Sequence, residues 1–572
     1  MSELELYKLW CENAVDDADL KAELLSIKDD SEAINDRFYR DLEFGTGGLR
    51  GVIGAGTYRM NIYTVRRATQ GLADYVNGSF KNGSVAIAYD SRIKSDVFAK
   101  EAASVLAANG IKVFIYPELA PTPMLSYAVR KCGCQAGIVV TASHNPAKYN
   151  GYKVYGEDGC QITLDVANIV ISKIKSVEMF GGAKLMSFDD AVSSGMIEFI
   201  SQDVFDSYLN EVLKQGIHTD LVATSGLKVV YTPLNGAGNK PVRAILKKIG
   251  ISEVTVVSEQ ENPDGNFPTC PFPNPEIKEA LAKGLELCEK VKPDLLLATD
   301  PDSDRVGIAV PSPDGEYVLF SGNEVGAMLL QYICSERTKL GTMPKNPVTV
   351  KTIVSTDIIR KISEEYNVEM REVLTGFKFI GEQIGFLEDK GEEKRYIFGF
   401  EESYGYLAGT YVRDKDAVVA SMLICEMAAF YRTKGITLLQ AREAMYNKYG
   451  NYVHTQKSFT CEGESGMERM KELMAMLRND TPKSIGGLKV LEFADYIASE
   501  SLNTVTGEKK AITLPKSDVL AFKLEKDASV IIRPSGTEPK IKAYYTTIAD
   551  TRDAALALEE TISADFKAIL GF

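Results

Sequence analysis

Three stretches of the chain repeat one alternation of short apolar strands and helices, and each repeat ends in a polar loop. Alternation of this kind is typical of α/β domains. The last strands of the three repeats are expected at residues 136–141, 294–298 and 395–400. Because ligands bind beyond the carboxyl ends of strands in open α/β sheets, the three loops predict three domains that face one cleft.

The alternation changes after about Tyr449, and the remaining residues predict a separate α+β domain with its own polar loop. We therefore predict three similar α/β domains with mixed sheets and a C-terminal α+β domain, arranged around one central cleft. A chain of 572 residues is long enough for three to four domains. A helix is expected at 277–290 in the second of the three repeats. The residues before Phe44 are interpreted as helical and packed on the first domain. The predicted domain ranges are 1–210, 211–322, 323–449 and 450–572.

The chain is acidic, with 65 Lys and Arg against 79 Asp and Glu and a net charge of -14. An acidic surface repels phosphate backbones and anionic lipid, so neither nucleic acid nor a membrane surface is an expected partner. The N-terminus does not resemble a signal peptide, and no apolar run reaches the roughly 18 residues of a membrane-spanning helix. Nine cysteines without a CxxC pair favour reduced thiols and a cytoplasmic location. A chain with this net charge can still bind small anionic ligands if basic side chains line their binding site.

The second polar loop carries three alternating carboxylates, Asp300, Asp302 and Asp304, directly after a buried strand. Carboxylates this close repel one another unless a cation lies between them, and all-oxygen ligands suit Mg²⁺ or Mn²⁺. The spacing does not fit an EF-hand, and a solvated acidic turn is the alternative. Arg305 favours the metal site, because a cation beside it is useful chiefly if an anion also binds.

The first polar loop, Thr141 to Pro146, follows a strongly apolar strand. Ser143 is a candidate nucleophile or phosphate carrier, and an ordinary turn residue is the alternative. The loop lacks the G-x-S-x-G pattern, and no Asp…His order supports a hydrolase triad. His144 is adjacent in sequence and is not expected to reach its neighbour's hydroxyl. Lys153 is a stronger candidate because the short loop returns it to the cleft, although most lysines lie solvated on the surface.

The third loop, Glu401 to Gly405, combines carboxylates with the hydroxyl of Ser403. Carboxylates accept hydrogen bonds from neighbouring sugar hydroxyls, which favours a carbohydrate ligand over an apolar one. A helix start or a solvated turn is the alternative. Downstream, Lys415 adds a cation able to bind an anion, and Thr375 and Gly376 offer backbone N–H groups near a helix start.

The C-terminal domain carries a fourth polar loop, residues 533–540, whose composition suits a phosphate cradle. A guanidinium pairs bidentately with phosphate, hydroxyls donate to it, and a glycine lets the backbone approach closely. The GxxxxGK[ST] spacing of a Walker loop is absent, and an ordinary turn is the alternative. A similar Gly-rich segment with an arginine, Arg50, lies near the N-terminus. The candidate phosphate contacts in the fourth loop are Arg533, Ser535, Gly536 and Thr537.

In this order the four loops closely resemble the motifs of the α-D-phosphohexomutase superfamily, and the resemblance spans nearly the whole chain. Within that superfamily the chain is most similar to the branch of phosphoglucomutases and phosphopentomutases. The segments that carry the resemblance are 141–146 (TASHNP), 300–305 (DPDSDR), 399–403 (GFEES), 533–537 (RPSGT), 44–51 (FGTGGLRG) and 262–268 (NPDGNFP).

The resemblance implies that Ser143 carries a phosphoryl group and is phosphorylated in the active enzyme. It also implies that the three aspartates of the second loop hold one Mg²⁺ together with an oxygen of that phosphoserine. Lys153 matches the position of a proposed general base, with Arg50 beside it. The implied substrate contacts are His144, Arg305, Thr375, Gly376, Glu401, Ser403, Lys415, Arg533, Ser535, Gly536 and Thr537.

The implied activity is that of a phosphosugar mutase, an isomerase that interconverts glucose 1-phosphate and glucose 6-phosphate. The route passes through the phosphoserine and glucose 1,6-bisphosphate, which also serves as activator. Mutases specific for pentose or mannose phosphates, and a glucose-1,6-bisphosphate synthase, are alternatives with the same chemistry. A metal-dependent sugar phosphatase and a non-catalytic sugar-phosphate-binding protein are alternatives from other classes. The expected partners are small-molecule sugar phosphates, and the expected assembly is a monomer or small homo-oligomer.

Overall fold

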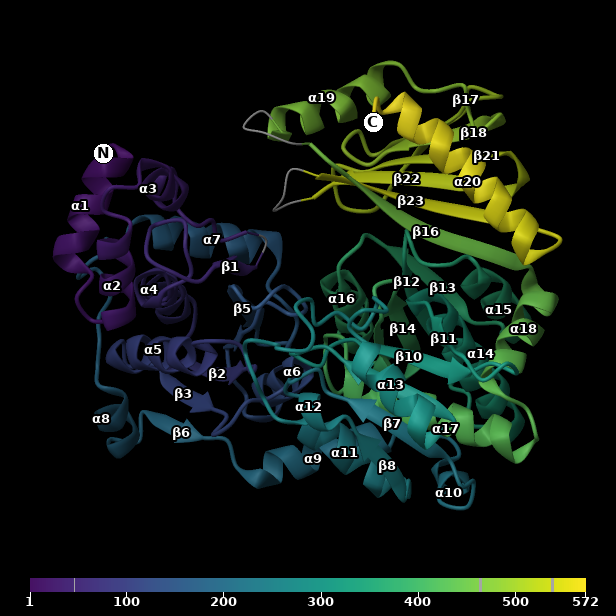
Figure 1. Cartoon of the computed structure of the whole chain (residues 1–572), viewed down its shortest axis with the longest axis horizontal. Helices are drawn as coiled ribbons and strands as arrows, with labels where there is room; N and C mark the ends of the chain where they lie inside the picture. Colours follow the sequence, from purple (N-terminus) through teal and green to yellow (C-terminus); the bar gives the residue numbers. More distant parts are fainter. Residues whose placement is uncertain (46, 462–465, 536–539) are drawn as a thin grey trace.

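The computed structural model describes residues 1–45, 47–461, 466–535 and 540–572. Four sheets follow one another along the chain, and Figure 1 shows the first domain on the left with the C-terminal domain above the second and third. Each sheet falls inside one of the four predicted domain ranges, whose boundaries stay predictions. Among the described residues no helix combines the length and apolarity needed to cross a bilayer.

The first sheet is mixed. The first polar loop, residues 141–146, follows its central strand β4 and is called the serine loop below. β4 is buried along its whole length and pairs in parallel with β2 and antiparallel with β5. Val85 and Ile87 of β2 point into one core with α4 and α5, whereas Ala86 and Ala88 point into another with α6, because side chains alternate along a strand. Both faces of the sheet are thus covered, as parallel strands require. In sheet order the strands are β1 (Gly48–Val52), β5 (Tyr149–Gly156), β4 (Ala136–Val140), β2 (Ser84–Tyr89), β3 (Lys112–Ile115) and β6 (Ile197–Phe199), and the helices are α4 (Ile62–Ser79), α5 (Ser95–Ala108), α6 (Thr122–Lys131), α7 (Leu164–Lys175) and α8 (Phe188–Ser193).

Three helices precede the first sheet and pack on its domain, as the sequence predicted. They are α1 (Glu3–Asn13), α2 (Ala18–Ser26) and α3 (Ser31–Phe38). Trp10 of α1 is buried and meets Tyr63 and Phe180 edge-to-face, at ring distances of 5.6 and 5.2 Å. Aromatic burial of this kind stabilises the contact beyond its area alone.

The second and third sheets repeat the design with fewer strands. In each, parallel central strands continue into an antiparallel hairpin, β9–β10 or β14–β15. The second polar loop, residues 300–305, joins β9 to β10 and is called the aspartate loop below. The third polar loop, residues 401–405, contains the turn of the hairpin β14–β15 and is called the glutamate loop. In sheet order the second sheet contains β11 (Tyr317–Phe320), β10 (Val306–Pro311), β9 (Leu295–Thr299), β7 (Lys228–Thr232) and β8 (Glu253–Val256), and the third contains β13 (Glu369–Val373), β12 (Val348–Thr352), β14 (Tyr396–Glu401) and β15 (Gly405–Leu407).

Helices cover these two sheets and connect them to the C-terminal domain. α14 and α17 contact each other, and α14 also packs on α15 and α18. The helices are α9 (Gln202–Leu213), α10 (Thr219–Val222), α11 (Asn239–Lys248), α12 (Ser258–Glu261), α13 (Ala282–Val291), α14 (Gly322–Leu340), α15 (Ile358–Tyr366), α16 (Phe377–Glu388), α17 (Ala417–Thr433) and α18 (Leu438–Tyr449).

The helix expected at 277–290 begins later than predicted. α13 starts at Ala282, and the preceding residues form tight turns with bonds such as Ala280 N–H to Ile277 carbonyl (3.2 Å). Ile277 and Ala280 pack into a small cluster with Cys270. Packing of the Pro-rich loop therefore overrides local helix propensity here.

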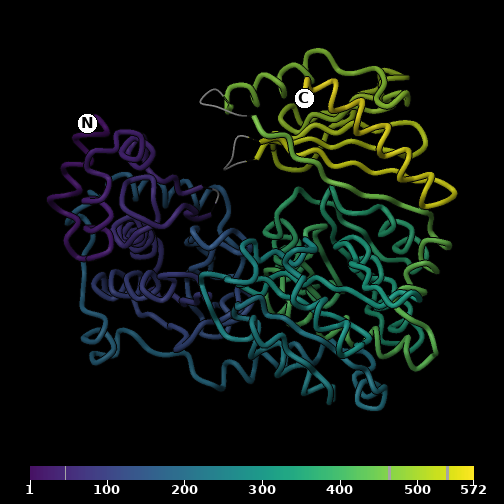
Figure 2. Tube along the Cα trace, in the orientation of Figure 1, coloured from purple at the N-terminus to yellow at the C-terminus, as the bar shows by residue number. Residues whose placement is uncertain are grey.

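In its described residues the C-terminal domain is an antiparallel sheet with two α-helices, which confirms the predicted α+β class. β16 follows directly after α18 and pairs along its whole length with β23. The tube in Figure 2 shows the N-terminus on the first domain and the C-terminus on the last. In sheet order the strands are β16 (Asn451–Thr460), β23 (Lys540–Ala549), β22 (Ser529–Pro534), β21 (Leu520–Leu524), β18 (Leu488–Asp495), β19 (Glu500–Asn503) and β20 (Lys509–Ala511), with β17 (Ser484–Ile485) on β18; the helices are α19 (Gly466–Asn479) and α20 (Arg552–Ile569).

Candidate active site

One cleft of about 760 Å³ opens where the four domains meet, and residues from every domain line it. Asp300 and Asp302 lie fully buried beside it. Ser535 is not among its described lining residues; its N–H donates to the carbonyl of Lys540 (2.8 Å) at the base of the hairpin. Thr46, Gly536 and Thr537 lie outside the described residues. The predicted site residues that line the cleft are Arg50, Ser143, His144, Lys153, Asp304, Arg305, Thr375, Gly376, Glu401, Ser403, Lys415 and Arg533.

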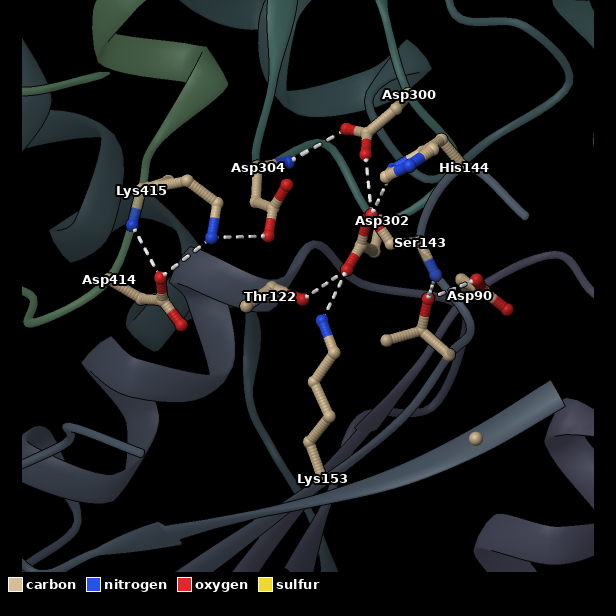
Figure 3. A network of polar contacts seen from close by, with 12 residues as sticks. Asp90, Thr122, Ser143, His144, Lys153, Asp300, Asp302, Asp304, Asp414 and Lys415 are labelled. Carbon is tan, nitrogen blue, oxygen red and sulfur yellow. Dashed lines mark hydrogen bonds and ion pairs between the residues drawn. The ribbon is translucent and has the colours of Figure 1, made fainter. Parts of the chain in front are cut away.

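Ser143 lies just beyond the carboxyl end of β4 in a left-handed conformation, with φ of 53°. Its N–H donates to the Thr141 hydroxyl (2.8 Å), which in turn donates to the carboxylate of Asp90 (2.6 Å). These bonds fix the tight turn and aim the side chain at the second domain. Its Oγ donates to Oδ2 of Asp300 at 3.0 Å, so the first two polar loops meet at this atom (Figure 3).

His144 reaches the hydroxyl of its neighbour, contrary to expectation. Its Nδ1 lies 3.1 Å from Oγ of Ser143, because the left-handed turn at Ser143 brings the two side chains together. Burial, and then the positive charges of Arg305 and Arg50, hold the pKa of His144 well below its ordinary value. The ring is therefore neutral at neutral pH.

Asp300, Asp302 and Asp304 form a buried group able to hold a metal ion, with one oxygen of each within 4.8 Å of the others. Burial and the two neighbouring carboxylates raise the pKa of Asp300 well above its ordinary range. Oδ1 of Asp302 and Oδ1 of Asp304 are buried without a hydrogen-bond partner among the described residues. Closely spaced, buried carboxylates with unpartnered oxygens are donors that a hard divalent cation prefers, so these residues fit Mg²⁺.

Two lysines from different domains flank this group (Figure 3). Lys153 on β5 lies 3.1 Å from Oδ2 of Asp302, and Lys415 in the third domain lies 3.1 Å from Oδ2 of Asp304. Burial would raise the pKa of Asp302, but Lys153, the neighbouring Asp300 and Lys415 together outweigh burial and hold that pKa below its ordinary value. Thr122 also donates its hydroxyl to Asp302 (3.0 Å). The three aspartates of the second domain are thus contacted by side chains of the first and third domains.

The glutamate loop and the start of α16 lie side by side on the third domain. The N–H of Gly376 donates to Oε1 of Glu401 (2.8 Å), which orients this carboxylate beside the cleft. The hydroxyl of Thr352 donates to Oε2 of Glu402 (3.2 Å). Acceptors of this kind suit sugar hydroxyls.

The C-terminal domain faces these groups with basic side chains on paired strands. Arg533 on β22 stands opposite Lys542 on β23, and its guanidinium donates to the hydroxyl of Tyr544 (3.0 and 3.2 Å). Burial, followed by the charge of Arg533, lowers the pKa of Lys542. Both side chains are therefore placed to bind an anion held between this domain and the others.

The family models for "Phosphoglucomutase/phosphomannomutase, alpha/beta/alpha" domains I, II and III match residues 41–179, 206–314 and 321–449 in that order. A phosphoglucomutase from Staphylococcus saprophyticus is 36% identical over 522 residues, which cover 91% of this chain and 93% of that protein. The chain belongs to the phosphoglucomutase/phosphomannomutase family. This family membership agrees with the superfamily that the four loops predicted.

Solved structures of the phosphoglucomutase/phosphomannomutase family share the fold of this member. Parafusin, an exocytosis-sensitive phosphoprotein and phosphoglucomutase from Paramecium, matches in its open form with a TM-score of 0.69 at 18% identity, over 94% of this chain and 95% of that chain. A family protein from Burkholderia thailandensis matches with a TM-score of 0.66 at 19% identity, over 92% and 97%. At this identity the likeness concerns the fold alone.

Several polar residues of this phosphoglucomutase/phosphomannomutase family member escaped the sequence analysis. Asp90 and Arg92 follow β2, so the strand-end rule that located Ser143 would have located them too. Lys542 and Tyr544 are two residues apart in β23, so their side chains lie on the same face of the strand. This spacing is visible in the sequence. Arg40 gives no such signal, because tertiary packing against Tyr58 brings it to the cleft.

Proposed function

We propose that this chain is a phosphoglucomutase that interconverts glucose 1-phosphate and glucose 6-phosphate through a phosphoserine at Ser143 and glucose 1,6-bisphosphate. The observation that carries the proposal is the position of Ser143: its Oγ meets Asp300 at 3.0 Å, beside a cleft lined with basic side chains. A phosphoryl group on this oxygen would lie between the three aspartates and the cations on the far wall.

In the first half-reaction the phosphoryl group passes from Ser143 to the free hydroxyl of the sugar monophosphate. The bond from phosphorus to Oγ breaks and a bond to the sugar oxygen forms. The sugar hydroxyl loses its proton with the assistance of Lys153 or Arg50, and Oγ of Ser143 takes up a proton to become a hydroxyl again. The bisphosphate then reorients, and Ser143 takes the other phosphoryl group by the reverse steps. The 760 Å³ of the cleft leaves room for this reorientation.

The substrate is held by groups from all four domains. Glu401 and Ser403 accept and donate hydrogen bonds at the sugar hydroxyls, while Thr375 and Gly376 border the same wall. His144, Arg305 and Lys415 contact the phosphate at the reacting end. We assign Arg533, Ser535, Gly536 and Thr537 to the phosphate that does not react.

Asp300, Asp302 and Asp304, with an oxygen of phosphorylated Ser143, would hold one Mg²⁺. Bound there, Mg²⁺ would neutralise charge on the transferred phosphoryl group. Because every proposed residue belongs to one chain, a monomer or a small homo-oligomer satisfies the chemistry. The nine cysteines are free thiols, which supports our proposal of a cytoplasmic, reducing location.

The test is a substrate panel of glucose, mannose and ribose 1-phosphates with Mg²⁺ and glucose 1,6-bisphosphate as activator. We expect turnover of glucose 1-phosphate to glucose 6-phosphate, lost on chelation and restored by Mg²⁺. Ser143→Ala should lower kcat by about a thousandfold or more, because the covalent route is removed. The matched control is Ser172→Ala on α7, whose hydroxyl contacts only its own helix among described residues.

Other outcomes of the same assay would replace the proposal. A clear preference for ribose or mannose 1-phosphate would make the chain a pentose or mannose mutase of the same mechanism. Inorganic phosphate as the main product would indicate a metal-dependent phosphatase. Full isomerising activity in Ser143→Ala would refute the phosphoserine route.

A further inference from the structure

The loop Asn262–Pro268 is one of the segments that carry the family resemblance. It lies outside the cleft but contacts the segment that supports the serine loop. It belongs to the second domain, yet it touches the turn after β2 of the first domain. A Cβ added at Gly265 would lie 2.4 Å from the N of Ile93 and 2.8 Å from the O of Ser91. Only glycine permits this backbone approach, so the two domains are joined closely at this point.

Phe267 is the side chain that this loop inserts between the domains. It is 1% exposed, and its backbone is left-handed, with φ of 48°. A bulky residue adopts this conformation only where its surroundings hold it there. Its ring lies 5.1 Å from the guanidinium carbon of Arg92, a desolvated cation–π contact.

Arg92 in turn holds the serine loop from behind. Its side chain is fully buried. One Nη donates to the carbonyls of Pro146 and Tyr149, both at 3.0 Å, and the other donates to the carbonyls of Ser143 and Asn145. One guanidinium therefore ties together both ends of the turn that presents the reactive hydroxyl.

We infer that Arg92 is a positioning residue for Ser143 and that Phe267 makes this positioning depend on the second domain. The second domain also carries the three aspartates that Ser143 must face. A planar guanidinium with four carbonyl partners has one orientation, and the aromatic face of Phe267 holds it there. The contact thus sets the serine loop in register with the metal-binding group, at the same interface where Ser143 meets Asp300.

The first measurement is hydrogen exchange of the peptide that covers residues 141–149. We expect Phe267→Leu, which keeps an apolar side chain but loses the aromatic face, to exchange there about tenfold faster or more. Phe272→Leu is the matched control, because Phe272 lies in the same Pro-rich segment and is 57% exposed. Wild-type exchange in 141–149 for folded Phe267→Leu would overturn the inference.

The second measurement rests on the proposed function and follows phosphorylation of Ser143 by glucose 1,6-bisphosphate. Phe267→Leu and Arg92→Lys should slow it about tenfold or more with KM within about twofold, since the reacting atom is misplaced while the substrate contacts remain. Arg66→Lys is the control for the arginine, because Arg66 pairs with Glu101 and Asp16 away from the loop.

The two measurements separate the two ideas. If wild-type protein shows no phosphorylation while exchange in 141–149 still rises in Phe267→Leu, the proposed function fails and the positioning role stands. If the wild type is an active mutase and neither variant changes exchange or phosphorylation, the positioning role is refuted. Arg92→Lys decides the case should Phe267→Leu not fold, because it alters the same contacts from the other side.

Discussion

Glu401 and Glu402 are adjacent in sequence, yet the fold gives them different surroundings. Glu401 accepts the N–H of Gly376, whereas Glu402 accepts the hydroxyl of Thr352. Burial and the negative charge of Glu401 raise the pKa of Glu402 to about 7. A carboxyl with such a pKa changes its charge near neutral pH, and stability then depends on pH.

We predict that Glu402 makes the folded chain less stable as the pH rises through about 7. Its pKa is raised by folding from 4.5, so its stabilising contribution is complete below about pH 4.5 and is lost above about 7. Glu402→Gln, which resembles the protonated form, should remove this dependence. Between about pH 5 and 8 the wild type should lose up to about 3 kcal/mol relative to the variant, measured by urea unfolding.

The control for Glu402 is Glu289→Gln on α13, an exposed carboxyl. We expect its unfolding curve to follow the wild type at every pH. Parallel pH profiles for wild type and Glu402→Gln would contradict the assignment of the raised pKa.

Among elements, the start of α16 decides where the carboxylate of Glu401 points. Gly376 precedes this helix with φ of 117°, and its N–H reaches Glu401 at the end of β14. Any side chain is strained in this backbone conformation, even though an added Cβ would meet only the ring of Phe379, at an ordinary contact distance of 3.8 Å. A helix start on one element therefore positions a side chain on another.

Gly376→Ala should raise the KM for glucose 1-phosphate about tenfold and destabilise the fold by about 1–3 kcal/mol, because the backbone must change or remain strained. Steady-state kinetics and thermal unfolding check the two effects. Gly435→Ala is the matched control, since Gly435 has φ of 72° and open space after α17. It should show a similar loss of stability with an unchanged KM, and a KM increase in both variants would disprove the local role.

Across the whole molecule, charge is distributed unevenly. The chain has a net charge of -14, but its cleft collects basic side chains from all four domains. The described lining also includes acidic side chains, and bound Mg²⁺ would shift the balance of charge in the cleft towards positive. The basic residues among the described lining are Arg40, Arg50, Lys153, Arg305, Lys378, Lys415, Arg533 and Lys542.

The direction in which kcat/KM changes with salt shows whether a dianionic substrate is attracted by the cleft or repelled by the acidic surface. If the cleft dominates, kcat/KM for glucose 1-phosphate should fall several-fold, roughly threefold to tenfold, as ionic strength rises from about 0.02 to 0.3 M, because screening weakens attraction. Arg533→Gln should lower kcat/KM and flatten this slope, whereas Arg432→Gln, on the outer surface at α17, should leave it unchanged. A rise of kcat/KM with salt would mean that the acidic surface dominates.

The sequence by itself determined the α/β class, the change to an α+β domain after Tyr449, and the four polar loops. These features depend on local patterns. Buried strands such as 136–140 are apolar runs in the sequence, and the polar loops that bind ligands come directly after their carboxyl ends. The start of α13 was predicted five residues too early, because packing of the Pro-rich loop decides it.

Only the tertiary structure decided which loops meet at one atom and what holds them there. Ser143 and Asp300 are 157 residues apart, and their contact depends on how two domains dock. The same docking places Phe267 on Arg92, a contact between side chains that no periodicity within one element predicts. Spacing along the chain specifies strands and turns, whereas relative domain placement depends on surfaces that exist only after each domain has folded.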